Sequence, residues 1–351
     1  MKTQDANFSS RPLLPLSNIV FYGCTDLFFS DGVYWRQLRR ICNTDLLCKK
    51  RVNSFAPIRQ DEILSTLREF YRDSLDRRPV NFCVKVAKLV NNILSRSAFK
   101  ERCKNQERLF EIIKQISQVG SGFGLSDPFP SLSWMDVKRR RKLETIHREV
   151  DMIMDEEVNE HRKMPKEQKM RDDEMGYLLD ALMEAKERGD LDIPLTLDNI
   201  KAVMLDVFFA GSDTSSATLE LCKDTCELLG YTIPSGTYAI INYWALARDP
   251  QYWTDAEEFK PERFEHGSVD FRGNNFEFLP FGAGRRMCPG ILLGMATIEE
   301  ALAYLLLHFD WRLPDEIGEK GLDMTEGFGA ISARKEPLHL IPTLRVPLPS
   351  F

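Results

Sequence analysis

One loop near the carboxyl end constrains this chain more than any other stretch. Residues 281–290 read FGAGRRMCPG and separate an extended apolar run from a long apolar stretch. Pro289 suits the first position of a helix, and apolar residues then recur at three- and four-residue steps, which predicts a long helix. Cys288 is therefore expected at a helix N-terminus, where the helix dipole and unpaired backbone N–H groups favour a negatively charged sulfur. The apolar residues are Ile291, Leu292, Met295, Ile298, Leu302, Leu305, Leu306 and Phe309.

The residues around this cysteine are of the types needed to hold a flat macrocycle by its metal. Gly282 and Gly284 permit a tight turn that brings the backbone close to a planar ligand. Gly290 leaves room for the ring, and the fork of Arg286 matches a carboxylate such as a haem propionate. Phe281 is expected to pack beside the sulfur and keep it dry. The loop therefore predicts a haem bound through a thiolate, which is a defined class of haem ligation.

The loop admits two other interpretations. A glycine-rich turn before a helix can cradle a phosphate, and such a module would bind nucleotides and show no Soret band. The pattern G-x-G-x-x-G fails here because position 287 is methionine, and no G-K-[S/T] follows. A lone loop cysteine is otherwise most often structural. The five-position pattern is more specific than either and favours the haem-thiolate interpretation. Its members are Phe281, Gly284, Arg286, Cys288 and Gly290.

The segment PFGAGRRMCPG, residues 280–290, resembles the haem-binding signature of cytochrome P450 enzymes, in the form found in plant microsomal members that oxidise specialised metabolites. The resemblance extends along nearly the whole chain. It implies a mainly α fold with a minor β region, incomplete relative to the family, in one domain that spans residues 1–351. It also implies that Cys288 is the ligand of the haem iron.

A second part of the haem site is expected on a helix near the amino end. Trp35 and Arg39, in YWRQLRRIC, are four residues apart and so share one helix face. Alone, such a pair is usually a surface stack. It resembles the W-x-x-x-R pair of the family, which implies that both side chains reach a haem propionate.

The apolar segment from residue 198 predicts a central helix that is buried on all sides. Its run ends in Gly211 and small hydroxyl residues, which cost helix stability, and such local inconsistency often marks a functional site. A helix kinked by serine and threonine is the alternative. The A-G-x-D-T motif of the family matches here, which implies space for dioxygen at Ala210 and Gly211 and proton delivery by Asp213 and Thr214.

Three residues are expected to line a substrate pocket. Phe208 lies on the central helix just before the motif. Phe328 and Ala330 belong to a turn near the end of the chain, and the resemblance implies that this turn points into the pocket.

The family pattern breaks near residues 220–230. LCKDTCELLGYTIPSGT resembles a strand and turn that the family places well after the central helix, yet here it begins almost at once, which predicts an internal deletion. The family's Glu-x-x-Arg helix is then missing, since the one such pair in this chain, Glu69 to Arg72, lies in another element. Arg263 and Glu262 of the PERF segment are therefore expected to lack partners, and an unpaired buried charge costs several kcal/mol.

With 351 residues and 43% hydrophobic content, the chain is long enough to build a sizeable core. A net charge of −6 gives no reason to expect a nucleic-acid partner. The cysteines show no C-x-x-C spacing, which favours a reducing compartment, and Cys222 and Cys226 have no nearby histidine for a zinc site. The start of the chain is polar and no run reaches the ~18 apolar residues of a membrane span. A soluble or peripheral protein is expected, whereas the family implies the cytosolic face of the endoplasmic reticulum membrane.

The resemblance implies a monooxygenase that uses dioxygen to hydroxylate a lipophilic small molecule, with a terpenoid or another plant specialised metabolite as the expected substrate class. The cofactor would be haem b (heme b, iron protoporphyrin IX). The partner would be an NADPH-cytochrome P450 reductase that passes on electrons from NADPH. A monomer with at most peripheral membrane contact is expected. The alternative, suggested by the missing Glu-x-x-Arg pair, is a catalytically inactive, truncated product with no stable haem.

Overall fold

A computed structural model describes residues 4–120, 124, 126–127, 129–164, 176–212, 217–265, 267, 269–327 and 334–349. Helices make up most of this part of the chain, as the sequence predicts. They are α1 (Pro15–Val20), α2 (Gly32–Ile41), α3 (Lys49–Ser54), α4 (Ala56–Leu75), α5 (Phe82–Phe99), α6 (Gln106–Gly120), α7 (Val137–Lys163), α9 (Leu178–Arg188), α10 (Leu197–Ser212), α11 (Tyr243–Leu246), α12 (Ile291–His308) and α13 (Asp315–Lys320). A π-helical turn covers Cys42–Leu46, and 3-10 turns cover Pro130–Asp136, Pro261–Phe264 and Gly284–Arg286.

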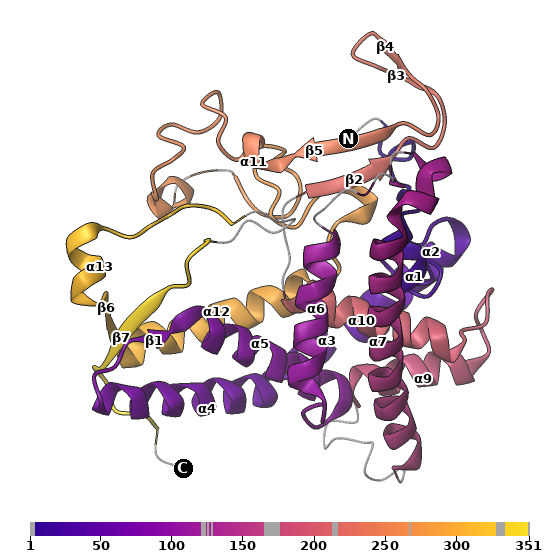
Figure 1. Ribbon diagram of the computed structural model, residues 1–351. Coiled ribbons are helices and arrows are strands. Elements are labelled where there is room, and N and C mark those ends of the chain that lie inside the picture. The colour runs from indigo at the N-terminus through magenta and orange to yellow at the C-terminus, as the bar shows by residue number, and fades with distance from the viewer. Residues whose placement is uncertain are drawn as a thin grey trace.

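The strands are short and form three small antiparallel sheets. They are β1 (Val80–Asn81), β2 (Ala217–Leu221), β3 (Cys226–Leu228), β4 (Tyr231–Ile233), β5 (Tyr238–Asn242), β6 (Phe309–Arg312) and β7 (His339–Leu344). One sheet has the order β1-β7-β6, and the other two are the pairs β2–β5 and β3–β4. Figure 1 shows both pairs above the helical body and the three-stranded sheet at the ends of α4 and α12. The fold is therefore mainly α with a minor β region, as predicted.

Helices α4 and α5 lie side by side (Figure 1) and enclose the smaller of two apolar clusters. In α4, Ile63, Leu67 and Phe70 recur at steps of four and three and are buried. Helix α5 begins where the Asn81 side chain accepts a hydrogen bond from the Val84 N–H at 3.1 Å. The cluster joins both helices to α12 and to the three-stranded sheet. Its other members are Val80, Leu89, Ile93, Ala301, Leu305 and Phe309.

Helix α10 is the central apolar helix, and the larger apolar cluster surrounds it. Thr196 Oγ1 accepts a hydrogen bond from the Asn199 N–H at 3.2 Å, and Asn199 Oδ1 accepts one from the Thr196 N–H at 2.8 Å. This reciprocal cap fixes the start of the helix. Near its other end, the Phe208 ring stacks on Phe99 with centroids 5.4 Å apart. The predicted burial is confirmed from Ile200 to Phe208, apart from the half-buried Val207, whereas Ala210 and Gly211 in the last turn are exposed.

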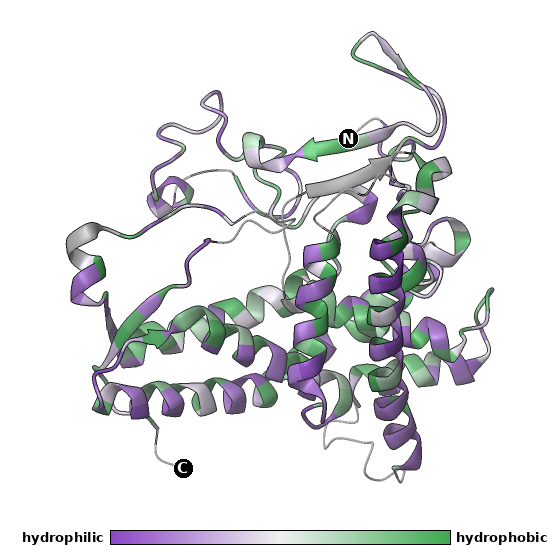
Figure 2. Cartoon of the chain, viewed as in Figure 1, coloured by the Kyte–Doolittle hydropathy of each residue, from purple (hydrophilic) through white to green (hydrophobic). Residues whose placement is uncertain are grey.

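Helix α12 leaves one apolar face in solvent. Leu293 and Leu305 are buried, whereas Leu302 and Leu306 are 52% and 53% exposed. Figure 2 shows apolar colour around most of this helix, in contrast to α7. By length and composition alone α12 would allow a membrane span, although Glu300 interrupts its apolar run. Because its buried face packs against α3, α4 and β6, the structure accounts for it as a helix of the protein body.

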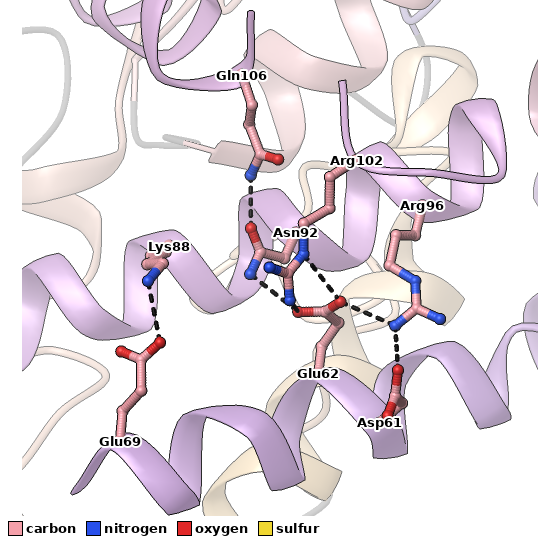
Figure 3. A network of polar contacts seen from close by, with 8 residues as sticks. All are labelled: Asp61, Glu62, Glu69, Lys88, Asn92, Arg96, Arg102 and Gln106. Carbon is pink, nitrogen blue, oxygen red and sulfur yellow. Dashed lines mark hydrogen bonds and ion pairs between the residues drawn. The ribbon is translucent and has the colours of Figure 1, made fainter. Parts of the chain in front are cut away.

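A buried carboxylate, Glu62, ties α4 to the helices that follow it (Figure 3). Its side chain is 1% exposed. Asn92 donates a hydrogen bond to it at 2.9 Å, Arg96 donates one at 2.8 Å, and Arg102 donates two at 2.6 and 3.2 Å. Gln106, the first residue of α6, donates in turn to Asn92 at 2.6 Å. Protein donors alone therefore satisfy this carboxylate, and they join α4, α5 and α6.

Candidate active site around Cys288

The loop before α12 closes on itself. The Cys288 N–H donates a hydrogen bond to the Phe281 carbonyl at 2.9 Å. Gly282 and Gly284 have φ angles of +70° and +68°, a left-handed conformation that glycine adopts without strain. A Cβ atom on Gly284 would clash with Asp5 Oδ1, and the left-handed φ would strain any other residue, so glycine suits this position. The tight turn predicted from the glycines is confirmed.

The Cys288 side chain is half-buried beside the start of α12. The Gly290 N–H donates to its Sγ at 3.3 Å. Burial raises the pKa of the Cys288 thiol above its usual value, and the Gly290 N–H and the positive charge of Arg39 offset part of that rise. In the protein alone this thiol is therefore protonated at neutral pH, and a bound metal would displace the proton.

Helix α12 begins two residues later than predicted. Gly290 is its N-cap and Ile291 its first helical residue, so Pro289 precedes the helix. The prediction is wrong because the Gly290 N–H is bound to Cys288 Sγ, which turns the chain before the helix starts. Cys288 still meets the helix N-terminus, through the N–H of the N-cap residue.

Trp35 and Arg39 lie on α2, whose first turn is capped by the Asp31 side chain. The positive charge of Arg39 acts on the Cys288 thiol, which places α2 and the loop at one site. Burial lowers the pKa of the Arg39 guanidinium. Within the described residues, the Arg39 side chain has no hydrogen-bond or ion-pair partner, so it is available to an anion. The Arg286 guanidinium lies 4.2 Å above the Trp35 ring centroid and joins the loop to α2.

The Arg286 guanidinium donates hydrogen bonds to backbone carbonyls. Its Nε donates to the Ser9 carbonyl and its Nη2 to the Ser30 carbonyl, both at 2.7 Å. Its Nη1 donates to the carbonyls of Leu27 and Phe28, both at 3.4 Å. The side chain is 6% exposed. Backbone carbonyls therefore occupy the Arg286 donors that the sequence predicts for a haem propionate. The propionate role of Arg286 stays a prediction, and it requires that the side chain first release these carbonyls.

The last turn of α10 carries part of the predicted dioxygen site. Ala210 and Gly211 are exposed there. A Cβ atom on Gly211 would clash with Leu94 Cδ1, so glycine allows α10 to pack closely on this side chain of α5. Phe208, assigned from the sequence to a substrate pocket, is buried in the larger apolar cluster, and its pocket role stays a prediction. The predicted residues Asp213, Thr214, Phe328 and Ala330 lie outside the described residues, and their roles stay predictions.

Comparison with known proteins identifies the family. The sequence profile described as Cytochrome P450 matches residues 1–222 and 221–340. The chain belongs to the cytochrome P450 family. Desmethyl-deoxy-podophyllotoxin synthase of Sinopodophyllum hexandrum is 36% identical over 98% of this chain and 80% of its own length. Premnaspirodiene oxygenase of Hyoscyamus muticus is 39% identical over 98% of this chain and 81% of its own length.

Because these relatives are plant proteins that align with nearly the whole chain, this chain is a plant cytochrome P450. A solved zebra fish cytochrome P450 with progesterone is 20% identical and shares the fold, with a TM-score of 0.75 over 97% of this chain and 89% of that one. The alignment with the desmethyl-deoxy-podophyllotoxin synthase spans 409 positions against a chain of 351 residues, so that relative contains residues that this P450 lacks. The two profile segments meet at residues 221–222. The P450 fold is therefore incomplete, and the two profile segments meet in the region where the sequence predicts an internal deletion.

Most of the residues present fit a haem held by a thiolate. Cys288 is a free, half-buried thiol, and Arg39 supplies a charge that no described side chain neutralises. Gly290 keeps the space beside the sulfur open, because a Cβ atom there would contact Cys288 Sγ at 3.7 Å. Cys288, Arg39 and Trp35 therefore fit the group that the P450 family implies. Arg286 can bind a haem propionate only after it releases the backbone carbonyls to which it donates.

Arg263 of the P450 PERF segment binds backbone carbonyls of its own loop. Its guanidinium donates hydrogen bonds of 2.9 to 3.1 Å to four backbone carbonyls in residues 254–260. Glu262 is exposed, so neither residue is an unpaired buried charge. The expectation of an unpaired buried charge is wrong for both residues, because loop carbonyls bind Arg263 and solvent reaches Glu262.

Substituting Arg263→Lys is expected to loosen this loop. A lysine keeps the charge, but its compact ammonium cannot reach four carbonyls that a planar fork spans. The loss of hydrogen bonds should cost about 1.5 kcal/mol of local stability, seen as faster amide hydrogen exchange in residues 254–260 by mass spectrometry. Arg285→Lys, at a 58% exposed side chain with one ion pair, is the control and should leave exchange unchanged. Equal exchange in both variants would show that the carbonyl contacts do not hold the loop.

Proposed function

We propose that this P450 is a haem-thiolate monooxygenase that hydroxylates a lipophilic small molecule. The observation that carries the proposal is the half-buried Cys288 thiol, with the Arg39 charge acting on it, in the loop that opens α12. The relatives are oxygenases and synthases of plant specialised metabolism. They include salviol synthase of Salvia pomifera, which is 36% identical over 100% of this chain and 81% of its own length. We infer a terpenoid or a similar plant metabolite as the substrate.

Cys288 would ligate the iron of haem b, and Trp35 with Arg39 would bind a propionate through the indole N–H and the guanidinium. Haem bound there supplies the activation of dioxygen, with electrons from a reductase. Asp213 and Thr214 would hold protons at their carboxyl and hydroxyl oxygens and deliver them to the site. Among the described residues no acceptor binds the Arg39 guanidinium, so Arg39 can bind an anionic ligand without first losing another partner.

Other residues would shape the site and keep water out. The Phe281 ring packs against Phe271 with centroids 5.9 Å apart and lies 4.0 Å from where a Cβ atom of Gly294 would be. It therefore covers the first turn of α12, which supports its proposed role beside the sulfur. Gly284 and Gly290 would leave space for the ring, as Ala210 and Gly211 would for dioxygen.

The electron donor would be an NADPH-cytochrome P450 reductase, since members of this family generally use one. Arg36 and Arg40 on α2, with Lys49 and Lys50 on α3, are exposed and suit an acidic partner surface. We further propose one domain over residues 1–351 that acts as a monomer, with peripheral contact to the cytosolic face of the endoplasmic reticulum membrane.

A second candidate is a truncated P450 product without catalytic activity. Two observations favour it: the alignment shows that relatives contain residues that this chain lacks, and the Arg286 donors are held by backbone carbonyls. In this case the chain would fold around its helical core and bind no haem stably.

The ferrous carbon monoxide difference spectrum of the purified chain, expressed with haem precursor, decides between the two candidates. A red-shifted Soret band with close to one haem per chain is expected if Cys288 ligates iron. A chain that folds, as shown by circular dichroism, but carries no haem would establish the inactive product. A band without the red shift would mean that haem binds through a ligand other than this thiolate.

A further inference from the structure

Two buried aspartates from distant parts of the sequence meet beside α2. Asp26, in the segment between α1 and α2, is 0% exposed, and Asp206 on α10 is 8% exposed. The Asp26 carboxylate lies close enough to Asp206 that, after burial itself, its charge contributes most to the raised pKa of Asp206. Two ionised carboxylates cannot hydrogen-bond to each other, because both are acceptors only, and their charges repel. One of the two groups therefore carries a proton.

The neighbouring hydrogen bonds indicate where this proton lies. Asp206 Oδ2 accepts the N–H groups of Leu27 at 2.6 Å and Phe28 at 3.3 Å. Asp26 Oδ2 accepts the N–H of Phe29 at 3.2 Å. Asp26 Oδ1 is buried, and no N–H or side-chain donor of the described residues reaches it. A proton on Asp206 Oδ1 can be donated in a hydrogen bond to Asp26 Oδ1, which then also has a partner.

The same segment is held from its other side by the loop of Cys288. Arg286 donates to the carbonyls of Leu27, Phe28 and Ser30. Residues 26–30 are thus bound to α10 through their N–H groups and to the Cys288 loop through their carbonyls. The position of the segment depends on both attachments.

We propose that Asp26 and Asp206 share one proton, and that this proton fastens residues 26–30 to α10 above the Cys288 loop. Loss of the proton leaves two buried negative charges in contact and releases the segment. The two aspartates are positioning residues, because they act on the loop through the segment. The attachment does not depend on the reaction proposed above.

The groups that face the pair do not supply a cation to replace the proton. Burial raises the pKa of Cys24, on the same segment, and that of Tyr34, on α2. Burial also raises the pKa of Cys42, after α2, to about 12. All three groups are therefore neutral near pH 7. Arg286, the nearest charged group on the loop, binds carbonyls on the far side of the segment.

The sign of the pH dependence follows from the direction of the shifts. Burial raises the pKa of Asp26 to about 7 and that of Asp206 well above its usual value. An exposed aspartate has a pKa of about 3.9. Above about pH 4, and up to the raised pKa of Asp206, the closed segment therefore holds one more proton than the open one. Its attachment is strongest below this window and weakens as the pH rises through it.

Amide hydrogen exchange of the full chain, measured from pH 4.5 to 8 and corrected for intrinsic rates, tests the proposal. In the wild type, the opening constant for the amides of residues 27–29 should rise about tenfold per pH unit from pH 4.5 until the shared proton is lost. Amides of α4, measured in the same samples, are the internal reference and should show no such slope. In Asp26→Asn the amide can donate to Asp206 and accept from Phe29, so the segment stays closed and the slope disappears.

Two further variants distinguish the effect of the shared proton from a general effect on folding. Asp76→Asn, at a 56% exposed side chain, should keep the wild-type slope. Asp206→Asn is a second variant in case Asp26→Asn does not fold, and it should also lose the slope. A wild-type chain without a slope, or a slope that survives in either Asn variant, would overturn the proposal.

Discussion

In the haem-loaded P450, Cys288→Ser is expected to abolish the red-shifted ferrous carbon monoxide band. The shift requires a thiolate on iron, and a serine hydroxyl is not deprotonated under the same conditions. Any haem that remains should show the band of a chain without thiolate ligation. The difference spectrum, together with the amount of haem per protein, measures the effect.

Cys83→Ser is the matched control for this variant, because Cys83 is also a free cysteine but is exposed and lies on α5. Its spectrum should equal that of the wild type. A red-shifted band that persists in Cys288→Ser would show that another residue ligates the iron, and the proposed role of the loop would have to be given up.

Glu62→Ala is expected to destabilise the chain by about 3 kcal/mol, because the charge-assisted hydrogen bonds to this carboxylate are lost and the buried Asn92 amide loses its acceptor. Arg96 and Arg102 lose their shared carboxylate, and Asn92 loses a buried acceptor (Figure 3). The free energy of unfolding from urea denaturation, followed by circular dichroism, measures the loss.

Glu69→Ala is the control, since Glu69 lies two turns further along α4 and pairs with Lys85 and Lys88 at 31% exposure. Exposed ion pairs contribute little, so the change should stay within about 1 kcal/mol. Similar losses in the two variants would show that burial does not distinguish Glu62, and that the network contributes no more than a surface pair.

Much of the fold could be predicted from apolar periodicity. The spacing in α4 and the apolar run of α10 identify helices whose observed burial agrees with the pattern. The exact helix start near Cys288 could not be predicted, because it depends on a hydrogen bond from Gly290 to a side chain. Helix boundaries depend on such local contacts, and residue types alone do not specify them.

The candidate site was predicted by residue type and only partly by contact. The turn glycines and the proximity of Arg39 to Cys288 agree with the pattern. The partners of Arg286 and Arg263 do not follow from the sequence, because both bind backbone carbonyls, which every residue offers. A guanidinium takes whichever acceptors the fold brings within reach, and the motif does not specify them.

The Asp26–Asp206 pair shows what sequence reasoning missed. Asp206 stands inside an apolar helix, and a carboxylate is rarely buried there without a partner. That signal was present in the sequence. The identity of the partner was not, since Asp26 lies far away in the chain and shares no motif with α10.

Strand pairing between the two ends of the chain has a consequence for synthesis. β1, at residues 80–81, pairs with β7, at residues 339–344, and together with β6 they close the smaller apolar cluster. A ribosome delivers β1 long before β7. The part of Phe70 that packs on Phe309 and Trp311 of β6 therefore stays uncovered until these late strands have been synthesised. This interval of translation is when the nascent chain most needs a chaperone.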